Sequence, residues 1–241
     1  MFRHEGPSRS HRNNEILAAY LAVTAGFVNA VGFTLLGAFT SHVTGNFGRV
    51  GDDLARNDVP AAWFAVALVA AFVVGSFTTT MILNTPRRRV AYGYGIALAI
   101  EATLLFAFVF APSHETIPNA REVDLQASLL CVAMGMQNSL VTRLSGAVVR
   151  TTHLTGVLTD LGIEAAHWWR WLFRGAKPGI ERPGTERSLL LATIVAGFAV
   201  GTVLGAVGAL HWGRWAVLFP AMAVVAAAAQ AFASETSRLR A

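Results

Sequence analysis

Two short segments of matching composition carry the side chains of this sequence that are best suited to bind a solute. Residues 40–45 (TSHVTG) in the first half of the chain correspond to residues 151–156 (TTHLTG) in the second half. Threonine and serine cap free N–H groups at a helix start, glycine permits close approach, and histidine hydrogen-bonds a solute or exchanges a proton. With the asparagine upstream of each segment, the candidate binding residues are Asn29, Thr40, Ser41, His42, Thr44 and Gly45, and Asn138, Thr151, Thr152, His153, Thr155 and Gly156.

A semi-polar helical stretch is expected after each segment, over residues 43–54 and 154–173. The first stretch reaches about 18 Å, roughly half a bilayer, and a half-helix is tolerated at that depth only where protein or water covers it. Since a helix N-terminus favours negative charge, two such helices that enter from opposite sides would create a central solute site. The alternative is structural, with capping hydroxyls, packing glycines and buried histidines, and the residues alone do not decide between the two.

Glu101 is the one carboxylate within the predicted membrane spans, and this makes it a candidate for proton coupling. The alternative is a protonated side chain that bonds to a neighbouring helix. Asp160, Glu164 and His167 have a spacing that could hold a metal, but no second cluster matches them, so no metal or other cofactor is expected. No nucleophile elbow, phosphate-binding loop or zinc-protease motif is present, and an enzyme is therefore not expected.

The elements that must position these residues are apolar. Hydrophobic residues make up 54% of the 241 residues and charged residues only 14%, against about 25% in a typical soluble domain. Segments of about 20 apolar residues are long enough to cross a bilayer. The sequence predicts an all-α membrane protein with six spans, at Ile16–Ala38, Ala61–Leu83, Val90–Ala111, Leu125–Val141, Ser188–Leu210 and Trp215–Ala233.

The two halves are related beyond the paired segments. Residues 26–29 (GFVN) match 135–138 (GMQN), and residues 72–76 (FVVGS) match 198–202 (FAVGT) in the same order. Because each half holds three spans, the second half must enter the membrane from the opposite side, which predicts an inverted repeat of the kind found in many secondary transporters. Gly197, Gly201 and Gly205 are spaced four apart and predict a helix-packing face.

The distribution of basic residues predicts the orientation. With the N-terminus in the cytoplasm, 15 of the 19 Lys and Arg residues fall on the cytoplasmic side. The expected organisation is listed in chain order: a cytoplasmic tail (1–15), a first three-helix repeat (16–111), an outer loop (112–124), a second repeat (125–233) with a cytoplasmic linker (174–187), and a cytoplasmic tail (234–241). The basic residues form no stripe beside aromatics, so the expected charge partner is lipid rather than nucleic acid.

The paired motifs resemble the YoaK-like family, a widespread family of bacterial membrane proteins of unknown function. The resemblance rests on residues 26–30 (GFVNA), 39–46 (FTSHVTGN), 135–138 (GMQN) and 150–160 (RTTHLTGVLTD), and extends over about 16–233. It implies a protein of the bacterial cytoplasmic membrane, with Asp or Asn at the position of Asn29. It implies no substrate.

Two functions are therefore expected from different classes. The first is a small-solute transporter or channel that uses both paired segments, with Glu101 coupling protons. The second is a non-transporting membrane protein, such as an assembly factor, a sensor or a lipid-binding subunit, for which the basic, Trp-rich residues 167–187 are the main support. The bilayer and an unknown small solute are the expected partners, and homo-oligomerisation is left open.

Overall fold

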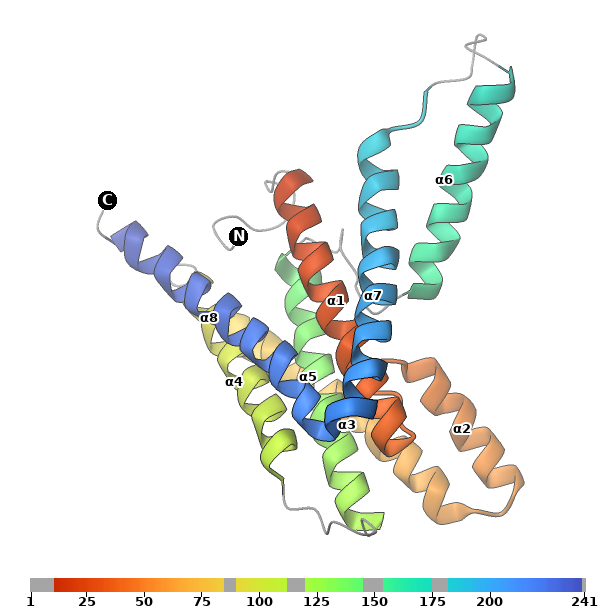
Figure 1. Cartoon of the computed structure of the whole chain (residues 1–241), viewed down its shortest axis with the longest axis vertical. Helices are drawn as coiled ribbons and strands as arrows, with labels where there is room; N and C mark the ends of the chain where they lie inside the picture. Colours follow the sequence, from red (N-terminus) through yellow and green to blue (C-terminus); the bar gives the residue numbers. More distant parts are fainter. Residues whose placement is uncertain (1–10, 85–89, 112–119, 145–153, 175–181, 240–241) are drawn as a thin grey trace.

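The helices of this protein are seen in a computed structural model that describes residues 11–84, 90–111, 120–144, 154–174 and 182–239. Within these ranges the chain is helical and contains no strand, which confirms the expected all-α class (Figure 1). In chain order the elements are α1 (His11–Leu36), α2 (Val43–Ala55), α3 (Val59–Leu83), α4 (Val90–Phe110), α5 (Ala120–Leu144), α6 (Leu154–Arg174), α7 (Thr185–Trp212), the short 3-10 helix η3 (Gly213–Val217) and α8 (Leu218–Leu239).

Four helical runs in the described residues are long and apolar enough to cross a membrane: Glu15–Leu36, Val59–Leu83, Ala91–Phe110 and Thr185–Ser234. The last of these holds two of the predicted spans, because α7 and α8 follow one another with only η3 between them. The predicted span Leu125–Val141 is not among them. Its helix, α5, is buried along most of that stretch, so it can carry polar side chains where a lipid-facing helix cannot.

Several predicted boundaries differ from those of the helices. Helix α1 begins within the predicted N-terminal tail, α5 within the predicted outer loop, and α8 continues into the predicted C-terminal tail. Helix α7 begins at Thr185, inside the predicted 174–187 linker. The predicted spans end where charged residues begin, whereas a helix can continue beyond the apolar layer into water.

The long helices pack in pairs, α1 against α7, α3 against α5, and α4 against α8 (Figure 1). Glycine allows the first two pairs to approach backbone to backbone. A Cβ atom at Gly135 would lie 2.0 Å from the Phe72 carbonyl oxygen, and one at Gly201 would lie 2.1 Å from the Val23 carbonyl oxygen. The predicted packing role of Gly201 is thereby confirmed, since any side chain there would displace α1.

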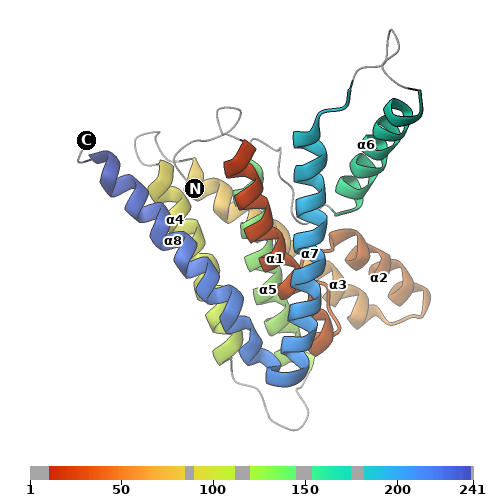
Figure 2. The ribbon, with the colours of Figure 1, turned by 45° about the horizontal axis from the view of Figure 1, so that its top comes forward.

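The core lies among α1, α4, α5 and α8, where Leu17, Tyr94, Leu98, Met134 and Val224 are fully buried. The two shorter or more polar helices lie at its edge, α2 against α3 and α6 against α7, and α6 contributes Val157 to the core (Figure 2). Residues 42–45 and 154–156, at the starts of α2 and α6, are therefore placed at the side of the bundle.

Candidate functional site

The first motif is held by a reversal of the chain at the end of α1. Gly37 adopts a positive φ of 63°, which disfavours residues with a Cβ atom. Its N–H donates to the Phe33 carbonyl (3.0 Å), and the N–H of Ala38 donates to the Gly32 carbonyl (3.4 Å). This is the hydrogen-bond pattern of a glycine-terminated helix, and it turns residues 38–42 back along α1.

The side chain of Asn29 holds the loop of residues 38–42 in place against α1. Its Oδ1 atom accepts hydrogen bonds from the Thr40 N–H (3.2 Å), the Ser41 N–H (3.2 Å) and the Ser41 hydroxyl (3.1 Å). Thr40 and Ser41 are buried, with 1% and 7% of their surface exposed. Asn29 thus connects α1 to the loop before α2, and its side-chain oxygen is fully used by the protein itself.

The next motif residues are exposed instead. His42 is the N-cap residue of α2, but its side chain makes no capping hydrogen bond. The imidazole packs edge-on against the Phe39 ring, with 5.4 Å between the ring centroids, and Thr44 is also exposed. Gly45 leaves room for the imidazole, because a Cβ atom there would lie 2.7 Å from His42 Nδ1. The histidine side chain is accordingly available to a ligand.

The first turn of α2 also presents free backbone donors. The first helical bond runs from the Asn46 N–H to the His42 carbonyl (3.1 Å), so the N–H groups of residues 43–45 precede it. No described side chain caps them. These donors, with the positive end of the helix dipole, favour an anion or a carbonyl oxygen.

The second motif is seen in part. Thr151, Thr152 and His153 lie outside the described residues. Thr155 and Gly156 are exposed on the first turn of α6, and Asn138 is buried on α5. In both views of the ribbon, the first turns of α2 and α6 lie near each other, and the two helices run from there toward opposite ends of the molecule (Figures 1 and 2).

One polar residue of this region was missed in the sequence. Asn46 is 2% exposed, and its Nδ2 donates to the Phe39 carbonyl (3.1 Å), while its Oδ1 has no hydrogen-bond partner. The matching residue of the second half is Val157, which is buried as well. The signal that could have revealed Asn46 is that its counterpart in the other half is the apolar residue Val157, so the position does not require an amide in both halves.

Glu101 lies in a different part of the molecule from the motifs. It is on α4, which packs against α8 and α5, and none of its surface is exposed. Neither carboxylate oxygen has a hydrogen-bond partner within the described part of the chain. The structure therefore does not bring Glu101 to the first motif.

The residues whose spacing could have suited a metal have another role. Arg187 of α7 approaches Asp160 (3.4 Å) and Glu164 (3.5 Å) of α6, and Glu164 Oε2 accepts from Ser188 Oγ (3.4 Å). Nowhere in the described ranges do three or more His, Cys, Asp or Glu side chains gather as a metal site would require. These carboxylates tie α6 to α7.

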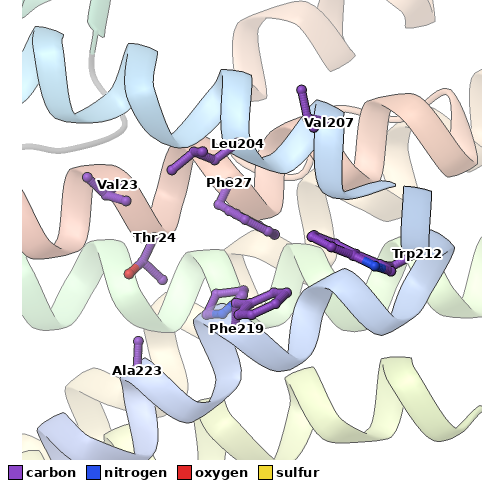
Figure 3. A pocket seen from close by; sticks show the side chains of 9 residues that line it. Val23, Thr24, Phe27, Leu204, Val207, Trp212, Phe219 and Ala223 are labelled. Atoms are coloured by element: carbon purple, nitrogen blue, oxygen red, sulfur yellow. The ribbon is translucent and has the colours of Figure 1, made fainter. Parts of the chain in front are cut away.

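An apolar groove of about 420 Å³ lies between α1, α7 and α8 (Figure 3). Phe27, Leu204, Trp212, Phe219, Thr24 and Ala223 are among the residues that line it. No predicted site residue lines this groove. Leu204 and Phe219 are more than half exposed, so the groove opens onto the outer surface of the bundle, where lipid would surround a membrane protein.

Long apolar helices with a buried carboxylate and glycine crossings define a helical transmembrane protein. A family model described as "Protein of unknown function (DUF1275)" matches residues 17–230, and the chain belongs to this family. It is similar to the UPF0700 transmembrane protein YoaK of Bacillus subtilis, with 27% identity over 155 residues, which cover 63% of this chain and 66% of that protein. The resemblance of the chain to the YoaK-like family is thus confirmed. No solved structure matches.

Proposed function

We propose that this protein is a small-solute transporter or channel without enzymatic activity, and that the solute binds between the first turns of α2 and α6. The observation that carries the proposal is the approach of these two turns from opposite directions (Figures 1 and 2). The α2 turn offers uncapped N–H groups and the exposed imidazole of His42, and the α6 turn offers Thr155. Such a pairing resembles the half-helix sites of secondary transporters.

The proposal includes two inverted repeats in a six-span protein of the bacterial inner membrane. The packing supports this relation. The repeat matches α1 with α5 and α7 with α3, and the glycine crossing between α1 and α7 corresponds to the one between α5 and α3. A Cβ atom at Gly26 would lie 2.2 Å from the Phe198 carbonyl oxygen, and the matching atom at Gly135 would lie 2.0 Å from that of Phe72. The basic residues of the sequence support cytoplasmic N- and C-termini.

A thermal-shift screen of the purified protein in detergent tests the proposed site. The panel holds inorganic anions, carboxylates, sugars, amino acids and nucleobases. A solute at 100 times its dissociation constant stabilises the folded state by about 2.7 kcal/mol. We expect one solute class to raise the Tm of the wild type but not that of the His42→Ala/His153→Ala variant.

The matched control is His211→Ala, which removes an exposed histidine at the far end of α7. This variant should respond to the solute as the wild type does. A solute that stabilises the double variant equally would place its binding site elsewhere. Uptake of the same solute by proteoliposomes then separates a transporter or channel from a protein that only binds it.

The second candidate is a non-transporting membrane protein, and the outer face of α6 favours it. Trp169, Leu172 and Phe173 are each about two-thirds exposed on this helix, and Arg182 lies over the rings of Trp168 and Trp171. Such an aromatic and basic surface suits an anchor in the lipid headgroup layer. If no solute in the thermal-shift panel stabilises the wild type, the result favours this second candidate over a transporter or channel.

A further inference from the structure

Three oxygen atoms in the core accept no hydrogen bond from any described residue. Two belong to Glu101 on α4 and the third is Oε1 of Gln137 on α5. Both side chains have 0% of their surface exposed. Buried polar atoms normally have partners, because an unpaired acceptor loses its bonds to water without compensation. A proton on one of these oxygens would reduce the deficit, because the resulting O–H group could donate to another of them.

The orientation of the Gln137 amide is fixed. Its Nε2 donates to the Leu21 carbonyl of α1 (3.2 Å), and only the NH₂ end of an amide can serve a carbonyl oxygen. The free end of Gln137 is thus an acceptor. At the matching position of the first half stands Val28, which is also fully buried, so packing alone does not require an amide there.

Glu101 lies in the same layer of the bundle as Gln137. Helices α4 and α8 are antiparallel, with Gly95 against Phe232 near one end and Phe110 against Trp215 at the other. In this antiparallel register Glu101 lies at the level of Val225, about half a helical turn from Ala223. The Ala223 carbonyl accepts the Tyr20 hydroxyl of α1, and Leu21, the partner of Gln137, is the next residue.

The described helix segments that pack around Glu101 contain no basic residue. From α1 the titratable side chain in this layer is Tyr20, whose hydroxyl is bonded to Ala223. Between residues 125 and 141, α5 has only Cys131 as a titratable residue, and that side chain faces the Phe39 carbonyl (3.9 Å). Residues 218–234 of α8 and 61–83 of α3 have none, and α4 itself adds Tyr92 and Tyr94. An ionised carboxylate would therefore lie in the core unpaired, at a large cost in free energy.

We propose that Glu101 and Gln137 form a buried proton site, in which Glu101 is a neutral acid whose O–H donates to Gln137 Oε1. Proton uptake forms the O–H bond on one Glu101 oxygen, and release returns the proton to water with the carboxylate left behind. A metal ion fits less well, because hard cations take six or more oxygen ligands. This inference deepens the proposed function, on which it rests, by naming the coupling ion and adding Gln137 as a positioning residue.

Infrared spectroscopy of the purified full chain tests the site directly, because a protonated carboxyl group has a C=O band that an ionised carboxylate lacks. At neutral pH we expect this band in the wild type and its loss in Glu101→Gln. In Gln137→Leu the band should remain but move to the frequency of an acid with a weaker hydrogen bond. Gln126→Leu is the matched control, since it removes another buried amide of α5 and should leave the band in place.

Cooperative thermal unfolding of each variant establishes that it is folded. A wild-type spectrum without a band that depends on Glu101 would overturn the proposal, as would a band that Gln137→Leu does not move. Stabilisation of wild type but not of Glu101→Gln by Na⁺, without the acid band, would assign the site to a metal cation instead. The band is measured without any solute, so its absence is distinguishable from a failure of the solute screen.

Discussion

At the scale of single residues, Asn29 connects structure to the candidate site. Its side-chain oxygen accepts three hydrogen bonds from Thr40 and Ser41, which set the direction in which the chain enters α2. The exposed His42 and the free N–H groups of the first turn of α2 come directly after Ser41 in the chain, so this direction decides where they lie. Asn29 was predicted in the sequence as a candidate binding residue, and in the structure its acceptor is occupied by the loop that presents the others.

Replacing Asn29 therefore tests the loop rather than a ligand contact. Asn29→Leu leaves buried donors without an acceptor, at about 1–3 kcal/mol for such a group, and we expect a lower Tm in detergent. Asn29→Asp keeps an oxygen in the same place and should retain most of the stability. If the two variants unfold at the same temperature, the three hydrogen bonds do not stabilise the loop.

The same scale shows what the sequence could not reveal. Residue types and their duplication pointed to His42 and Thr44, which are exposed on the first turn of α2. They could not show that Asn46 and Gln137 each keep a buried oxygen unpaired, because that depends on which helix faces them. Comparison of the halves contained a signal for both, since valine is the counterpart of each amide.

At the scale of helices, glycine decides which pairs approach most closely. Gly135→Ala would push a methyl group against the Phe72 carbonyl, and overpacking of this kind costs about 1–3 kcal/mol. We expect a clear fall in Tm, measured by the unfolding of the purified protein. Gly162→Ala in α6 is the control, because nothing lies within 4 Å of the added Cβ, and there alanine favours the helix. Equal effects of the two changes would contradict the close crossing.

Most helices could be predicted from apolar length, and their ends could not. A run of uncharged residues shows where the hydrocarbon layer permits a helix. However, α7 begins before its apolar run, at Thr185, and α8 continues after its apolar run to Leu239. Burial also decided the character of α5. Its polar residues reduce its mean hydropathy, yet this helix lies within the bundle and faces other helices more than lipid.

At the scale of the whole molecule, the proposed topology predicts which face each exposed loop meets. In a Cys131→Ala background, Arg56→Cys after α2 should react with an impermeant thiol reagent in intact cells. Thr185→Cys at the start of α7 should react only after the membrane is opened. Both positions are exposed, so accessibility within the protein does not limit either reaction. Reaction of position 185 from outside would overturn the six-span arrangement.

The glycine crossings also determine which parts of the molecule move as units. Where backbones touch, as α1 and α7 do at Gly201, there is no side chain whose rotamer could change to let one helix slide past the other. We therefore expect each crossed pair to move as a unit. Displacement is easier where helices meet through side chains, as α8 and α1 do along the groove in Figure 3. Moving α4 and α8 relative to these two pairs therefore disturbs no glycine-mediated backbone crossing among the described helices, and the hydrogen bond from Tyr20 of α1 to the Ala223 carbonyl of α8 joins the two parts.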